Sequence, residues 1–124
     1  MKSAWIALGL CLPLACAAQA PNPWDGKWKV DFRTERGTPR DGTVTVAGEG
    51  GTWDLNVVQR NDPCAGRAYP IEVQVATADQ LVFKVARSKT LAGCQDNTMR
   101  LKANGTNTLE GTLFNQPFVL TRMN

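Results

Sequence analysis

Apolar and polar residues alternate along short stretches of this chain. In residues 27–33, Trp28, Val30 and Phe32 are separated by charged residues, which gives a period of two. That period is typical of a β-strand with one buried and one solvated face. The same signature recurs at Val44 and Val46; at Trp53, Leu55 and Val57; at Ile71, Val73 and Val75; at Leu81, Phe83 and Val85; at Met99 and Leu101; at Leu109, Gly111 and Leu113; and at Phe118 and Leu120.

The pattern predicts an all-β domain of eight strands without a helix. The strands follow one another about every ten residues with turn residues between them, a spacing typical of barrels and sandwiches. We expect an eight-stranded antiparallel up-and-down barrel, with a β-sandwich as the alternative. Connections after the first, third and fifth strands are long, over residues 34–42, 60–68 and 88–96. In an up-and-down meander these three loops emerge at the same end.

The short loops predict how the strands face one another, because apolar residues on paired strands must point to the same side of the sheet. We expect Val46 opposite Trp53, across a loop of residues 48–51. The remaining expectations are Val75 opposite Leu81, Leu113 opposite Phe118 across the turn Asn115-Gln116, and a three-residue loop over Asn104–Thr106.

The first twenty residues differ from the rest of the chain. Met1-Lys2 precedes an apolar run that ends in Ala18-Gln19-Ala20, as in a secretory signal peptide. The run is shorter than the roughly twenty residues that a membrane-spanning helix needs. We therefore predict a signal peptide over residues 1–20 and a single domain over residues 21–124, secreted or periplasmic. A retained membrane anchor and a lipid anchor at Cys16, in the partial lipobox Leu14-Ala15-Cys16, are the alternatives.

Removal of the leader leaves two cysteines, Cys64 and Cys94. An exported chain with two cysteines is expected to pair them. Both lie in long loops that the meander places at one end, so a disulfide between them is geometrically reasonable. A reactive thiol or a metal site is the rival interpretation, but the chain has no C-x-x-C motif and no histidine.

Gly26-Lys27-Trp28 at the start of the first strand and Arg122 at the end of the last strand resemble the calycin pattern of lipocalins and avidins. That resemblance implies a cup-shaped barrel, in which Trp28 packs inside the closed end under the Arg122 guanidinium. Residues 29–34 lack the polar residues with which avidins bind biotin. The many inward apolar side chains predict an interior that is mostly filled, since an eight-stranded barrel is just wide enough to be filled or to hold one small ligand.

The long-loop end is the predicted binding site. A ring of basic residues there can hold carboxylates or phosphates; its predicted members are Arg36, Arg40, Arg60, Arg67, Arg87 and Lys89. We expect an exported binding protein for a small anionic ligand or a protein partner. The alternative is a protein-interaction factor, such as an enzyme inhibitor or envelope accessory protein, for which Tyr69 and Phe114 are the aromatic candidates outside the predicted core.

Composition argues against several other functions. The whole chain has a formal charge of +3, and loss of Lys2 leaves about +2, which is too mild to indicate nucleic acid. Without histidine there is no Ser-His-Asp or Cys-His arrangement and no ordinary catalytic zinc site. The carboxylates stand in no motif typical of a glycosidase. We expect no catalysis, no cofactor, no metal and no membrane-spanning segment in the mature chain.

Overall fold

The computed structural model describes residues 21–57 and 61–123. The predicted leader, Cys16 and Arg60 lie outside the described residues. The strands are β1 (Gly26–Arg33), β2 (Pro39–Ala47), β3 (Gly50–Leu55), β4 (Ala68–Ala76), β5 (Gln80–Val85), β6 (Asn97–Ala103), β7 (Thr108–Leu113) and β8 (Gln116–Arg122), and a short 3₁₀ helix, η2 (Arg87–Lys89), follows β5. Across the described part of the chain, no helix is long and apolar enough to span a bilayer.

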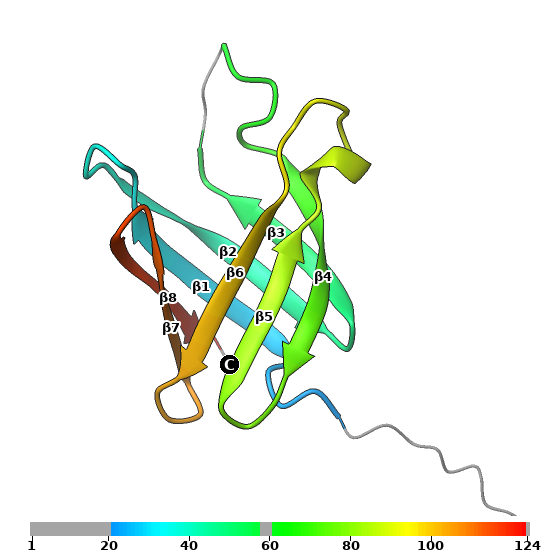
Figure 1. Ribbon diagram of the computed structural model, residues 1–124, viewed down its shortest axis with the longest axis vertical. Helices are drawn as coiled ribbons and strands as arrows, with labels where there is room; N and C mark the ends of the chain where they lie inside the picture. Colours follow the sequence, from blue (N-terminus) through cyan, green and yellow to red (C-terminus); the bar gives the residue numbers. More distant parts are fainter. Residues whose placement is uncertain (1–20, 58–60, 124) are drawn as a thin grey trace, which may run out of the picture.

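The eight strands form one closed antiparallel barrel in the order of the sequence (Figure 1). Each strand pairs with the next, and β1 closes the barrel against β8, where Trp28 lies opposite Arg122 and Phe32 opposite Phe118. This confirms the predicted up-and-down barrel over the sandwich. We call the end at which the connections after β1, β3, β5 and β7 emerge the open end, and the other end the closed end.

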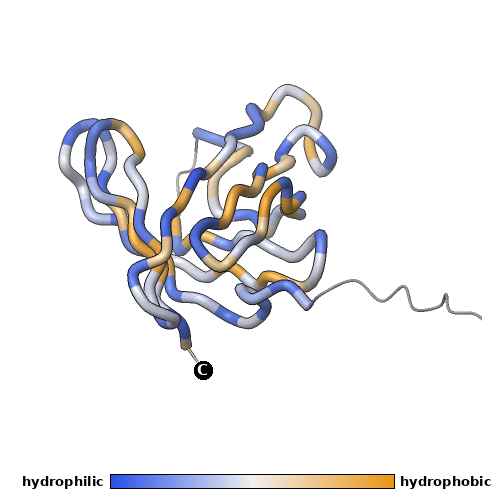
Figure 2. Tube along the Cα trace, turned by 60° about the horizontal axis from the view of Figure 1, so that its bottom comes forward, coloured by the Kyte–Doolittle hydropathy of each residue, from blue (hydrophilic) through white to orange (hydrophobic). Residues whose placement is uncertain are grey.

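The alternation of apolar and polar residues determines which side chains point into the barrel. In β1, Trp28 and Val30 are fully buried, whereas Lys27, Lys29 and Asp31 are exposed. Figure 2 shows the same change between hydrophobic and hydrophilic residues along the strands. The buried core contains most of the predicted inward residues: Trp28, Val30, Val44, Val46, Trp53, Ile71, Leu81, Phe83, Val85, Met99, Leu101, Leu109, Phe118 and Leu120.

Two predicted hairpin registers are wrong by two residues. Val46 lies opposite Gly51, so the first hairpin has a turn of two residues in place of the expected four. Leu113 lies opposite Gln116, so the second hairpin keeps a two-residue turn that is displaced by one residue from the expected Asn115-Gln116. Gly51 fits where the strands approach closely, because its φ is +141° and a Cβ there would lie 1.9 Å from the Thr45 carbonyl oxygen. In the second hairpin the two turn residues are Phe114 and Asn115, both with positive φ, as a tight primed turn requires.

A β-bulge between Val73 and Val75 makes the predicted pairing of Val75 with Leu81 wrong. Leu81 lies opposite Ala76, and Val75 lies opposite Val82. The bulge adds one residue to β4 and so moves Val75 off the core face, where Ala76 packs instead. The Thr77 N–H donates to the Gln80 carbonyl, which leaves a two-residue turn in place of the expected three.

The loop between β6 and β7 is displaced by one residue from the predicted Asn104–Thr106. The Asn104 N–H donates to the Thr108 carbonyl, so the three loop residues are 105–107. Ala103 therefore lies opposite Leu109, a shift of two residues that keeps Leu109 on the buried face as expected.

The predicted long loops differ in length from the observed ones. β2 begins at Pro39, opposite Arg33, so the first connection is only residues 34–38. The first residues of β2 are polar, so no alternation of apolar and polar residues indicated that the strand begins at Pro39. The second connection is longer than expected because β3 ends at Leu55 and excludes Val57. The chain folds back there, and a Cβ on Gly66 would lie 2.2 Å from the Val57 carbonyl oxygen.

Cys64 and Cys94 form the predicted disulfide, with their Cα atoms 5.8 Å apart. It joins the β3–β4 loop to the β5–β6 loop at the open end. Tyr69 of β4 anchors the loop that carries Cys64, since its hydroxyl donates to the Cys64 carbonyl at 2.5 Å. Tyr69 is buried in β4, so its placement outside the core was wrong.

Two tryptophans fill the closed end. Trp28 is fully buried, and its Nε1–H donates to the Trp24 carbonyl at 2.9 Å. Trp24, which the sequence analysis did not single out, is also buried and donates its Nε1–H to the Thr77 carbonyl at 2.7 Å. Arg122 covers Trp28, and Gly26 leaves room for it because a Cβ there would lie 3.2 Å from Arg122 Nη1.

Candidate ligand-binding site

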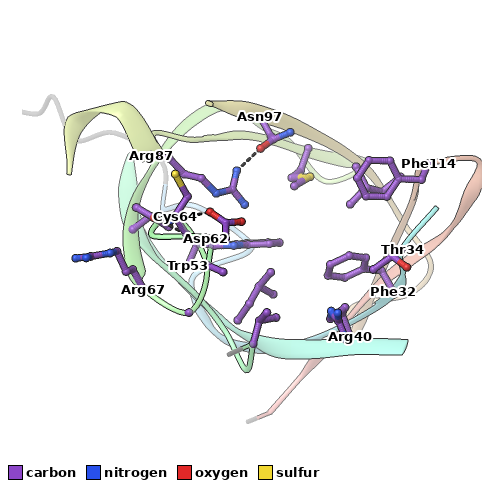
Figure 3. A pocket seen from close by; sticks show the side chains of 17 residues that line it. Phe32, Thr34, Arg40, Trp53, Asp62, Cys64, Arg67, Arg87, Asn97 and Phe114 are labelled. Carbon is purple, nitrogen blue, oxygen red and sulfur yellow. Dashed lines mark hydrogen bonds between the residues drawn. The ribbon is translucent and has the colours of Figure 1, made fainter. Parts of the chain in front are cut away.

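The open end of the barrel contains a cavity of about 280 Å³ (Figure 3). The expectation of a filled interior therefore holds for the closed end and is wrong for the open end. The cavity is lined by seventeen residues: Phe32, Thr34, Arg40, Trp53, Leu55, Val57, Asp62, Cys64, Ala65, Gly66, Arg67, Tyr69, Arg87, Asn97, Met99, Leu113 and Phe114. They come from the open ends of the strands, from the two disulfide-linked loops, and from the β1–β2 and β7–β8 connections, which contribute Thr34 and Phe114.

Aromatic rings form the floor of the cavity. Trp53 is buried in β3 and stacks on Phe118 with the ring centroids 5.9 Å apart and the planes at 8°. Phe83 packs against the same indole at 6.0 Å. Phe32 also lines the cavity and packs on Phe118 at 5.5 Å. These contacts fix a rigid apolar surface at the depth where the packed core ends.

Arg87 brings a positive charge into this mostly apolar cavity, which we call the cup. It begins η2, and Figure 3 shows its side chain pointing into the cavity toward Asn97. Its Nη1 donates to the Asn97 side-chain oxygen and, at 3.4 Å, to the Gln95 carbonyl. The guanidinium carbon lies 5.5 Å from the centroid of the Tyr69 ring. Asn97 and Tyr69 thus hold Arg87 in one orientation.

The Arg87 guanidinium is charged but incompletely hydrated. Burial lowers the pKa of Arg87 from its ordinary value, while Tyr69, Asp96 and Asp62 act to raise it. An arginine stays protonated in proteins at neutral pH even so. Among the described residues, Nε and Nη2 donate no hydrogen bond within the protein. That free edge is a planar fork of donors, which matches the geometry of a carboxylate.

The other predicted basic residues contribute unequally to the cavity. Arg40 lines it from β2, and its Nη1 donates to the Pro39 carbonyl at 3.3 Å. Arg67 lines it with its stem, because its Nε donates to the Pro63 carbonyl and Figure 3 shows its guanidinium pointing away. The structure thus brings Arg40 and Arg87 together around the cup, and Arg67 stands at its margin.

Arg36 and Lys89 do not belong to the cup. Arg36 is exposed in the β1–β2 connection and does not line the cavity. Lys89 forms an ion pair with Glu72, which also contacts Lys84 at 3.2 Å. Lys89 and Lys84 lower the pKa of Glu72, and Glu72 raises that of Lys89.

Several lining residues were not predicted as ligand-binding residues: Asn97 was not named, and Tyr69 and Phe114 were named only as candidates for contact with a protein partner. Tyr69 continues the alternation of Ile71 and Val73 by one step, and Asn97 does the same for Met99 and Leu101. Extending both strands toward the long loops would have placed these two side chains inside the barrel. Phe114 gave no such signal, because it lies in a turn.

Asp62 is the one carboxylate among the residues that line the cavity. It accepts a hydrogen bond from the Cys64 N–H at 2.9 Å and so shapes its own loop. The described residues contain no cluster of three or more His, Cys, Asp or Glu side chains suited to a metal ion. Comparison of the chain with protein-family models, with curated proteins and with solved structures finds no match.

Proposed function

We propose that this protein is an exported, non-catalytic binding protein that holds a small anionic ligand in the cup at its open end. The observation that carries the proposal is the Nε and Nη2 edge of Arg87, which donates no hydrogen bond to the described residues, inside a cavity of about 280 Å³. Ligand sites are typically concave and mostly apolar, with a few fixed polar groups that orient the ligand. The ring of Phe32, the indole of Trp53 and the charge of Arg87 supply those elements.

Export is supported by the leader and by the disulfide. A charged start, then an apolar run, then an A-x-A ending is the order of segments in a signal peptide. A disulfide such as Cys64–Cys94 persists in oxidising compartments, which include the periplasm and the extracellular space. We therefore assign the protein to one of these two compartments.

A calycin-like relationship is part of this proposal. Its support is the closed eight-stranded meander together with the Arg122 guanidinium over the Trp28 ring, 4.3 Å from the centroid. In such a barrel the loops at one end surround the entrance, and the other end is plugged. The cup described above lies at the end opposite the plug.

The absence of catalysis is proposed from the chemistry of the cavity wall. The chain has no histidine, and Asp62 is the single carboxylate in the lining. Hydrolysis by a pair of carboxylates needs two of them on opposite sides of the substrate bond. The lining therefore suits recognition of a charge and an apolar body.

Two fluorescent probes of similar shape test the proposal. Anilinonaphthalene sulfonate carries one negative charge, and N-phenylnaphthylamine carries none. We expect both to enter the cup and to quench Trp53 fluorescence. Arg87→Gln should weaken binding of the sulfonate roughly 10- to 100-fold, the range for loss of a hydrogen bond to a charged group. Binding of the neutral probe should be unchanged, which also shows that the variant is folded.

Arg36→Gln is the matched control, since it removes the same charge from an exposed residue outside the cavity. It should leave the affinity for both probes within about twofold at physiological salt, where exposed charges are screened. Equal affinity of the sulfonate for the Arg87→Gln variant and the native protein would contradict the proposal. The proposal would also be contradicted if neither probe bound to the native protein.

A further inference from the structure

The β6–β7 loop contains the one asparagine of the chain that is followed by glycine, Asn104-Gly105. Asparagine is a chemically labile residue, and its side-chain amide can be attacked by the next peptide nitrogen. Glycine has no side chain to hinder that approach. Every other asparagine with a following residue precedes a larger one, and Asn22 precedes a proline, which has no N–H. Asn104 is therefore the asparagine most open to this reaction.

The loop leaves the attacking nitrogen of Gly105 accessible. Asn104 and Gly105 are both exposed, and a Cβ added at Gly105 would meet no atom within 4 Å. The Gly105 N–H donates no backbone hydrogen bond within the described part of the chain. Its φ is +77°, a left-handed conformation that glycine adopts without strain. Neither packing nor a backbone hydrogen bond thus protects this nitrogen.

The same loop holds Arg122 at the closed end of the barrel, where Figure 1 shows it beside the β4–β5 turn. The Thr106 carbonyl accepts hydrogen bonds from Nε and Nη2 of Arg122, both at 3.2 Å. The Asn107 carbonyl accepts the Arg122 N–H at 2.9 Å. Arg122 in turn covers the Trp28 indole. A change in the length of this loop therefore acts on the residue that covers the closed end.

The Asn104 amide also faces a carboxylate. Its Nδ2 donates to Glu110 Oε2 at 3.1 Å. An acid in place of the amide loses this donor and puts a second negative charge beside Glu110, where like charges repel. Lys102, which pairs with Glu110 in the ladder, is the one facing cation for both. That ladder has two residue pairs, against six between β5 and β6, so few backbone bonds resist the change.

We propose that Asn104 is a site of spontaneous deamidation and that the product releases Arg122 from the β6–β7 loop. The Gly105 nitrogen bonds to Asn104 Cγ, the Cγ–Nδ2 bond breaks, and the Gly105 proton leaves with that nitrogen as ammonia. Water then opens the cyclic imide. Opening at Cγ gives aspartate. Opening at the main-chain carbonyl gives isoaspartate, in which the backbone runs through the side chain and is one carbon longer.

The test is prolonged incubation of the full mature protein in mildly alkaline buffer, which favours loss of the Gly105 amide proton. Peptide mapping with electron-transfer fragmentation then locates the product and distinguishes isoaspartate from aspartate. We expect both acids at Asn104. Asn115, which is exposed in another turn but precedes Gln116, should stay intact. Asn104→Gln should block the reaction because its longer side chain would have to close a larger ring.

Hydrogen exchange measures the consequence for Arg122. In the isoaspartyl protein, separated by ion exchange, exchange of the Arg122 N–H should quicken by roughly three- to tenfold, the range for loss of one backbone hydrogen bond. Amides of β2 and β3 should be unchanged, which shows that the protein is still folded. Freshly purified Asn104→Asp adds the charge without the extra backbone carbon, so its Arg122 N–H should quicken less.

Two results would overturn the inference. If Asn104 stays intact in the folded protein, it is not a deamidation site, and modification of the same protein in urea would show that the fold protects it. If isoaspartate forms at this position while the Arg122 N–H exchanges at its original rate, the modified loop still holds Arg122 and the proposed release is wrong. The cup is untouched by either result.

Discussion

The Arg122 guanidinium covers the Trp28 indole across the strand pair that closes the barrel. Trp28 and Arg122 are directly opposite in the β1–β8 ladder, and the guanidinium carbon lies 4.3 Å from the ring centroid. Arg122 also donates to the Asp25 carbonyl at 2.9 Å and to the Thr106 carbonyl at 3.2 Å. One side chain thus joins the N-terminal segment, the β6–β7 loop and the closing strands.

Trp28→Ala should cost about 3 to 5 kcal/mol of unfolding free energy, as for other buried aromatic residues. The loss includes the cavity left under Arg122 and the hydrogen bond to the Trp24 carbonyl. A domain of this size has about 5 to 15 kcal/mol in total. Urea unfolding followed by circular dichroism measures the change. Arg36→Ala, at an exposed loop position, should stay within about 0.5 kcal/mol.

Replacing the turn Phe114-Asn115 by Asn-Gly should stabilise the fold and impair binding. Both residues have positive φ, 55° and 60°, which Asn and Gly adopt more easily than Phe. We expect a gain of about 1 kcal/mol in unfolding free energy. Binding of N-phenylnaphthylamine should weaken at the same time, because Phe114 lines the cavity. Asn115→Gly alone is the control, and it should stabilise the turn without loss of affinity.

Removal of the disulfide should lower stability by about 3 to 4 kcal/mol in the chain-entropy model, because it closes a loop with a sequence separation of 30. The variant Cys64→Ala with Cys94→Ala, made in one chain, avoids a free thiol. Thermal unfolding compared with the oxidised native protein measures the loss. A variant as stable as the native protein would show that the two loops are held by other contacts.

Acid should weaken the β5–β6 loop through Asp96. Its carboxylate accepts hydrogen bonds from the Ser88 N–H at 2.8 Å and the Ser88 hydroxyl at 3.0 Å. Chiefly the backbone bond lowers the pKa of Asp96 from its ordinary value. A carboxyl group with a lower pKa in the folded state contributes stability above its unfolded pKa of about 4 and loses it as pH falls through the folded pKa.

The unfolding free energy should therefore fall as pH is lowered from about 5 toward 2, a window set by that downward shift. Asp96→Asn should show a shallower fall over the same range, since it has no proton to take up. The lowered pKa of Glu72 acts in the same direction and remains in the variant. Superimposable pH profiles for the two proteins would show that Asp96 contributes nothing to the acid response.

The strands and core could be predicted because alternation determines which face each residue occupies. Alternation does not distinguish registers that differ by two residues, since such a slip leaves every side chain on the same face. Val46 was therefore paired with Trp53, although Gly51 lies opposite it. Turn conformation selects the register. In the β7–β8 hairpin the two turn residues with positive φ are Phe114 and Asn115, and without a glycine between the strands the sequence did not indicate where the turn lies.

The site could be predicted only as an end of the barrel. Loop position gave Arg36, Arg87 and Lys89 equal weight, because a sequence does not show which way a loop side chain points. The structure distinguishes them through local partners: Lys89 pairs with Glu72 on the outside, whereas Asn97 holds Arg87 in the cavity. Hydrogen bonds within an irregular loop, such as those between Ser88 and Asp96, carry no periodic signal.

The plugged end of the barrel also gathers both ends of the described chain. Trp24 packs beside the β4–β5 turn, and the Met123 N–H donates to the Lys27 carbonyl. A linker, fluorescent label or affinity tag attached at Pro21 or Met123, the ends of the described chain, would thus project from the side opposite Arg87. The protein can be immobilised on a sensor through these ends with the mouth of the cup facing the solution.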